Sequence, residues 1–123
     1  MATLSDRRTV ATFEEEGFVP SPGEPGLLWK NISFDEDRGV GSYLMIFKPG
    51  AKSAAHRHDG AEEWYMVEGD LIDHDGHEYH AGEFVSLAAG SSHESVSPSG
   101  CKIVVHHQGP FTSINKAELD KAS

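Results

Sequence analysis

The sequence has few of the features that would assign it to several common classes of protein. It contains a single cysteine, Cys101, so an internal disulfide is impossible and a reducing compartment is favoured. Its longest apolar run, at 43–47, is far too short to span a bilayer, and the N-terminus lacks the apolar stretch of a signal peptide. We therefore expect a cytoplasmic protein with no membrane partner.

Basic residues are also scarce. Ten Lys and Arg stand against 20 Asp and Glu, which gives a formal net charge of −10. Nucleic acids are bound through clusters of Lys and Arg, and the sequence has no such cluster, so we expect no nucleic-acid partner. The acidity is typical of a well-solvated surface. Histidine, in contrast, is abundant, with eight residues.

Thirteen glycines and six prolines interrupt the chain at short intervals. The runs between them are rich in Val, Ile, Phe, Tyr and Thr, which is typical of β-strands. We predict strands within 26–34, 41–49, 62–69, 70–74, 82–88 and 101–108. Turn signals fall at 59–60, 69–70, 75–76, 81–82 and 97–100, and Asp75-Gly76 is the best hairpin turn. This pattern predicts an all-β sandwich or barrel.

Helix signals occur only near the two ends of the sequence. Thr12 with Glu15, and Asn115 with Glu118, have the spacing of a capping box, in which two side chains satisfy the free backbone groups at a helix start. Gly17 would stop the first helix almost at once. We therefore predict short terminal helical segments at these two places.

The stretch HRHDGAEE at 56–63 concentrates polar groups next to a predicted strand. Residues i and i+2 of a strand share a face, so His56 and His58 can converge. Neutral imidazole is the commonest protein ligand for metals, and a carboxylate adds an oxygen that Fe(II), Mn(II) or Zn(II) accepts. Solvated or hydrogen-bonded imidazoles are the alternative for such a pair on its own. Adjacent strand residues face opposite ways, so Glu62 and Glu63 cannot both reach one ion.

Two spaced motifs surround these residues. Gly50–Gly69 reads G-x5-H-x-H-x3-E-x6-G, which resembles the first motif of the cupin family. Gly82–Ser97 resembles the second, G-x5-P-x-G-x2-H-x3-N, with Ala88 in place of the proline and Ser97 in place of the asparagine. The resemblance implies a cupin double-stranded β-helix, or jelly-roll barrel, as a single domain over 1–123 with its core at about 27–110.

The same resemblance implies one divalent transition metal held by His56, His58, Glu62 and His93. Glu62 is preferred to Glu63 because it leaves the six residues before Gly69 that the motif requires. Fe(II) is the favoured ion, while Zn, Mn and Ni accept the same ligands. The alternative is a degenerate cupin that keeps these residues without binding a metal.

Four further residues are expected to line a substrate pocket, and they are Trp64, Met66, Ser97 and His106. Trp64 and Met66 share the face of Glu62 in a regular strand. One of His106 and His107 must face inward, and the sequence leaves open which of the two it is. Around the Asp75-Gly76 turn, His74, His77 and His80 are expected to be exposed rather than to form a second metal site.

Closer resemblances suggest two classes of function. The sequence is similar to the C-terminal cupin of ChrR-type anti-sigma factors and to small cupins that cleave diketones and hydroxyacetophenones with Fe(II) and O2. The second similarity implies a metal-dependent dioxygenase acting on a small β-dicarbonyl or phenolic ketone or acid, or a redox-neutral lyase or isomerase with the same site. Those dioxygenases often use three histidines, so a retained Glu62 leaves their substrate in doubt.

The first similarity implies instead a non-catalytic metallo-cupin that senses a small ligand. Anti-sigma factors of this type add a zinc-binding domain that holds the sigma factor, whereas the first forty residues here contain neither Cys nor His. We therefore expect a small-molecule partner rather than a sigma factor. A homodimer is expected because small jelly rolls have sheet edges and apolar faces that a second copy can cover.

Overall fold

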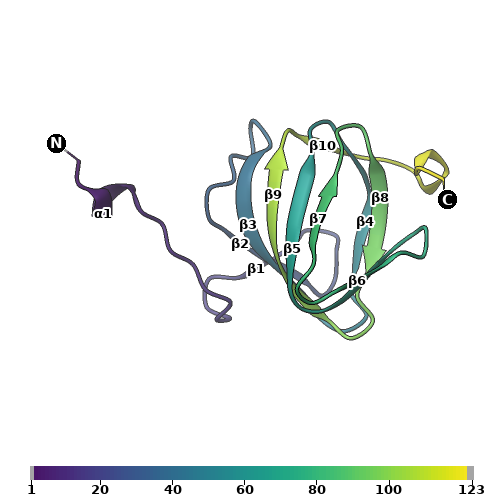
Figure 1. The fold of residues 1–123 in the computed structure, drawn as a ribbon, viewed down its shortest axis with the longest axis horizontal. Coiled ribbons are helices and arrows are strands. Elements are labelled where there is room, and N and C mark those ends of the chain that lie inside the picture. The colour runs from purple at the N-terminus through teal and green to yellow at the C-terminus, as the bar shows by residue number, and fades with distance from the viewer. Residues whose placement is uncertain (1, 122–123) are drawn as a thin grey trace.

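The computed structural model describes residues 2–121 and contains a curled antiparallel sheet that closes into a jelly-roll barrel (Figure 1). Its strands are β1 (Val19–Pro20), β2 (Leu27–Asn31), β3 (Val40–Phe47), β4 (Lys52–His58), β5 (Glu62–Asp73), β6 (Glu78–His80), β7 (Phe84–Leu87), β8 (Ser92–Val96), β9 (Cys101–Gln108) and β10 (Phe111–Ser113). They are ordered β1-β2-β3-β9-β5-β8-β4-β10, and β6 and β7 both pair with β5. The predicted all-β class is confirmed.

The strands form because apolar residues alternate with polar ones. In β9 the inward positions Cys101, Ile103 and Val105 are buried, while the residues between them are partly exposed. This period of two matches the alternation of side chains across a sheet. Inward side chains from β3, β5 and β9 meet in one apolar core, which surrounds the interior of the barrel.

Strand β5 corrects one prediction. A turn was expected at 69–70, but the strand runs unbroken from Glu62 to Asp73. Gly69 has φ of 85°, and the pairing with β9 shifts register between Met66 and Glu68. A glycine in the left-handed region lets the strand bulge and bend without ending. The first half of β5 therefore pairs with β7 and β9, and the second half pairs with β6 and β8.

The hairpin at Asp75-Gly76 is confirmed, because β5 and β6 pair directly across it. The predicted helix after Thr12 is absent: within the described residues, 13–17 form bends and a turn. The carbonyls of Thr12 and Glu14, which a helix would pair with backbone N–H groups, instead accept hydrogen bonds from the Lys30 ammonium at 2.8 and 3.0 Å. The N-terminal helix is instead α1 (Leu4–Arg7), which Thr3 caps.

The C-terminal helical segment lies where the sequence predicted it, as η1 (Lys116–Glu118) capped by Asn115. The residues that follow it are fastened to the barrel, since the Asp120 carboxylate accepts the backbone N–H of Ser92 at 3.0 Å. The N-terminal segment leads away from the barrel (Figure 1). Across residues 2–121 the structure has no helix of the length and apolarity needed to cross a membrane.

Candidate metal centre

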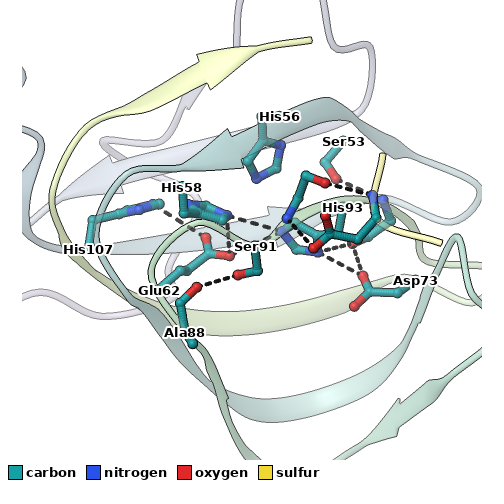
Figure 2. A network of polar contacts seen from close by, with 12 residues as sticks. Ser53, His56, His58, Glu62, Asp73, Ala88, Ser91, His93 and His107 are labelled. Carbon is teal, nitrogen blue, oxygen red and sulfur yellow. Dashed lines mark hydrogen bonds and ion pairs between the residues drawn. The ribbon is translucent and has the colours of Figure 1, made fainter. Parts of the chain in front are cut away.

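Four side chains from three neighbouring strands converge inside the barrel, and they are His56, His58, Glu62 and His93 (Figure 2). His56 and His58 project inward from the end of β4, and Glu62 begins β5. His93 of β8 is the direct cross-strand partner of His56. Strand pairing therefore brings together residues that are up to 37 positions apart in the sequence.

The distances between their ligand atoms are short. Nε2 of His58 lies 2.9 Å from Oε1 of Glu62, and Nε2 of His93 lies 3.2 Å from the same oxygen. The two imidazole nitrogens are themselves 3.2 Å apart. The ring of His56 completes the group, with its centroid 4.7 Å from that of His93. Ligands bound at about 2.1 Å and at right angles around an ion lie about 3 Å apart, so these spacings suit one ion.

The hydrogen bonding of Glu62 also fits a metal ion. Its Oε1 is buried and has no hydrogen-bond partner, although it lies near two imidazoles. A buried polar atom without a partner is costly, and an ion at the point shared by the ligand atoms would satisfy it. Three imidazole nitrogens with one carboxylate oxygen are a donor set for late first-row divalent metals. The residues present could therefore hold such an ion.

Two of the imidazoles are held by their other nitrogen. Nδ1 of His56 bonds to the carbonyl of Ala54 at 2.7 Å, and Nδ1 of His93 bonds to Oδ1 of Asp73 at 2.9 Å. Each bond leaves Nε2 free to act as a ligand. The sequence prediction missed Asp73. The available signal was an acidic residue at an inward position of a strand, two residues after the buried Leu71.

Charge and burial act against each other in this cluster. Burial alone would raise the pKa of Glu62, but the nearby His58 and His93 outweigh it and lower that pKa. Burial would lower the pKa of His93, whereas the carboxylates of Asp73 and Glu62 outweigh it and raise the pKa to about 9. Burial lowers the pKa of His56. In the metal-free protein the cluster is thus an ionised carboxylate with at least one charged imidazole.

An apolar cavity of about 230 Å³ opens onto three of the four residues, His56, Glu62 and His93, while His58 lies buried behind them. Its walls include Leu27, Trp29, Met45, Phe47, Leu71 and Ile103, and its polar side includes His56, Glu62, His93 and His107. His107 is buried, which lowers its pKa to about 4 and leaves a neutral imidazole. The Tyr43 hydroxyl and Nε2 of His107 share a hydrogen bond of 2.8 Å, and the same nitrogen is 3.4 Å from Oε2 of Glu62.

Of the four predicted pocket residues, Trp64 does line the cavity, and the other three lie elsewhere. Met66 is fully buried in the core, and Ser97 donates a hydrogen bond to the carbonyl of Asp70. His106 lies on the outer face of β9 and bonds to Ser42. His107 takes the inward place because it is the direct cross-strand partner of Glu62. The sequence could not supply that pairing, and it gave no sign of Tyr43.

The three histidines near the hairpin do not form a second metal site within residues 2–121. Nε2 of His74 bonds to the carbonyl of Asp120 at 2.5 Å. His80 lies 3.8 Å from Glu78, and the ring of His77 packs on Tyr79. Each side chain therefore has a separate neighbour.

Comparison with known proteins identifies similar sequences and folds. The family model described as the ChrR cupin-like domain matches residues 6–112. None of the curated proteins matches the sequence. Among solved structures, an acetylacetone dioxygenase from Acinetobacter johnsonii superposes with a TM-score of 0.78 and 16% identity, covering 94% of this chain and 85% of that chain.

Two further structures are similar. The polyketide cyclase RemF from Streptomyces resistomycificus has a TM-score of 0.63 and 21% identity, over 81% of this chain and 79% of that chain. The complex of SigE with the anti-sigma ChrR from Rhodobacter sphaeroides gives a TM-score of 0.65 and 16% identity, over 79% and 51% of the two chains. At these identities the likeness concerns the fold.

Proposed function

Because this chain belongs to the ChrR cupin-like domain family, we propose that it is a metal-dependent enzyme, a non-haem dioxygenase acting on a small oxygenated compound. One observation carries the proposal: three imidazoles and a carboxylate converge on one side of an apolar cavity. We assign His56, His58, Glu62 and His93 as the ligands of one divalent ion, with Fe(II) favoured over Zn, Mn or Ni. The similar acetylacetone dioxygenase supports this reaction class.

When bound, the ion would supply Lewis acidity to substrate oxygens and, as Fe(II), reactivity toward O2. The apolar walls of the cavity would exclude water from the site. Tyr43 and His107 stand beside Glu62, so they can hydrogen-bond a substrate oxygen or hold a proton at Nε2 of His107. The ring of Trp64 stacks on that of His93 at 5.8 Å and would keep this ligand in place.

The size of the cavity limits the substrate. Sites for drug-sized ligands span roughly 300–1,000 Å³, and this cavity of about 230 Å³ is smaller. Apolar walls with oxygen-binding groups on one side suit a compact compound whose oxygens lie together. We therefore propose a β-dicarbonyl compound or a phenolic ketone or acid as the substrate.

Metal analysis and oxygen consumption test the proposal. Protein expressed without added metal should contain close to one iron per chain, and Fe(II)-loaded protein should consume O2 only when a diketone or phenolic ketone is added. His58→Ala should abolish the consumption, while His77→Ala in the exposed hairpin should leave it unchanged. Iron-loaded protein that shows no substrate-dependent uptake across such a panel would contradict the dioxygenase.

Two other functions have a specific observation in their favour. The solved structure of ChrR in complex with SigE favours a non-catalytic metallo-cupin that senses a small ligand. Tightly bound zinc with no turnover of any compound in the panel would support it. The structure of the polyketide cyclase RemF favours a redox-neutral lyase or isomerase. Turnover with Zn or Mn in the absence of O2 would distinguish that activity.

We also propose that the protein forms a homodimer through the outer face of β5 and β7. Tyr65, Val67 and Phe84 are 41%, 39% and 66% exposed there, and Tyr65 pairs directly with Phe84. Neighbouring exposed apolar side chains favour association with a second copy. Light scattering at micromolar concentration should give twice the mass of one chain, and Phe84→Asp should halve it. A monomeric wild type would contradict the dimer.

A further inference from the structure

A buried carboxylate lies behind the candidate metal centre, on the side of His93 that faces away from Glu62 (Figure 2). Asp73 is the last residue of β5 and is 6% exposed. Its Oδ1 accepts hydrogen bonds from Ser95 at 2.5 Å and from Nδ1 of His93 at 2.9 Å, and its Oδ2 accepts one from Tyr79 at 2.5 Å. It does not line the cavity, so a substrate there cannot touch it.

The charge of Asp73 needs a partner. Burying an ionised carboxylate is costly unless a positive charge lies nearby. Two of its three donors, Tyr79 and Ser95, are neutral hydroxyls. The remaining donor is His93, which can supply positive charge either as an imidazolium or through an ion bound to its other nitrogen. The carboxylate and the metal centre are therefore joined through a single imidazole ring.

The other two imidazoles lack such support. His56 is held by a backbone carbonyl, which carries no net charge, and Nδ1 of His58 is buried with no hydrogen-bond partner. A carboxylate on the far nitrogen fixes the tautomer and makes the near nitrogen a better electron donor to a metal. His93 is consequently the one ligand candidate with ionic support.

We propose that Asp73 is a positioning residue for the metal centre, which holds His93 as the Nδ1–H tautomer and strengthens metal binding through Nε2. The inference rests on the proposed assignment of His93 as a ligand. The fold places Asp73 for this role, because it is the cross-strand partner of Ser95, two residues from His93 on the same face of β8. The β5–β6 hairpin brings Tyr79 to the second oxygen of the same carboxylate.

A purely structural role makes a different prediction. If Asp73 only joined β5, β6 and β8, loss of either Tyr79 or the carboxylate charge would destabilise the fold without singling out the metal. If Asp73 positions His93, loss of the carboxylate charge must weaken metal binding, whereas loss of the Tyr79 hydroxyl must not. Tyr79→Phe removes one hydrogen bond to Asp73 and leaves the contact with His93, so it is the matched control for Asp73→Asn.

Zinc affinity of the full-length chain separates the two roles. Competition with a chromophoric chelator should show Asp73→Asn binding Zn(II) about 10–100-fold more weakly than wild type, the cost typical of losing such a partner. Tyr79→Phe should stay within about threefold, since the partner of His93 remains. Equal weakening of both variants, or wild-type affinity in Asp73→Asn, would overturn the inference while the metal site itself stands. A wild type that binds no zinc would overturn the proposed ligand assignment as well.

A second measurement needs no substitution and so does not depend on the folding of a variant. Nitrogen-15 spectra of the imidazoles in zinc-loaded wild type should show His93 protonated at Nδ1, with slow exchange of that proton, and metal-bound at Nε2. A proton on Nε2, or zinc on Nδ1, would overturn the inference, because Asp73 could then not be accepting the hydrogen bond that defines its role.

Discussion

Seven of the eight histidines fall into two groups with different surroundings. The barrel histidines are His56, His58, His93 and His107, and the hairpin histidines are His74, His77 and His80. The hairpin histidines lie close together in the sequence and the barrel histidines are spread over 56–107, yet only the barrel histidines converge on common neighbours within the described residues. The hairpin histidines each have a separate neighbour. Histidine density alone is therefore a poor indicator of a metal site.

Strand geometry explains the difference. His56 and His58 are two residues apart in β4, so they share the inner face, and pairing with β8 places His93 opposite His56. His74 and His77 instead flank a tight turn, where the backbone reverses and side chains point to different sides. Polar groups on the inner face of a barrel can meet because the sheet closes around them, whereas those on a hairpin tip face solvent or the nearest loop.

The largest expected effect tests this comparison directly. His58→Ala should weaken zinc binding by roughly a hundredfold or more, because four ligands share a site energy of about 10–16 kcal/mol. His77→Ala should leave the affinity unchanged. Isothermal titration of both metal-free variants gives the two values. A loss in His77→Ala equal to that in His58→Ala would mean that the hairpin histidines also contribute to binding.

Metal addition should also stabilise the barrel. An ion that binds only the folded state, at a free concentration of about 100 times its Kd, adds about 2.7 kcal/mol to the free energy of unfolding. Wild type and His77→Ala should therefore melt several degrees higher with zinc than after chelation, and His58→Ala should not respond. Thermal scans with and without chelator provide the measurement. Equal melting temperatures for metal-free and zinc-loaded wild type would contradict a metal-binding barrel.

The sequence could predict the features that depend on local spacing, but not those that depend on the pairing of distant strands. The convergence of His56 and His58 follows from their spacing within one strand, whereas the addition of Glu62 and His93 came from the resemblance of two sequence motifs to those of cupins. The pocket residues were not predictable in this way. Choosing His107 over His106 requires the pairing of β9 with β5, and that register depends on the whole sheet. Asp73 was missed because its role depends on a strand twenty residues further along the chain.

The adjacent residues Glu62 and Glu63 allow the same comparison between an inward and an outward side chain of one strand. Glu62 is buried in the candidate metal centre, whereas Glu63 faces outward. The cross-strand partner of Glu63 is His106, which also faces outward. Glu62→Ala should weaken metal binding at least about tenfold, or 1.4 kcal/mol, since it removes a charged ligand. Glu63→Ala should stay within a few-fold of wild type. Metal titration into both metal-free variants measures this, and the reverse ranking would contradict the structural register of β5.

The smallest expected effect concerns pH. His93 has a pKa of about 9 in the metal-free protein, well above its ordinary value of 6.5, because the attraction of Asp73 and Glu62 outweighs burial. A metal must displace the proton on Nε2, so affinity should rise by up to about tenfold per pH unit from pH 6.5 toward pH 9. The stability of the metal-free fold changes with pH in the opposite direction to metal affinity. Charged His93 stabilises this fold fully below pH 6.5, and the stabilisation is lost as the pH rises through 9. A site built from histidines with ordinary pKa values, as expected for an exposed cluster, would instead reach constant affinity soon above pH 7. Zinc competition titrations at half-unit steps from pH 6.5 to 8.5 distinguish the two, and a flat profile above pH 7.5 would show that the carboxylates do not hold this proton.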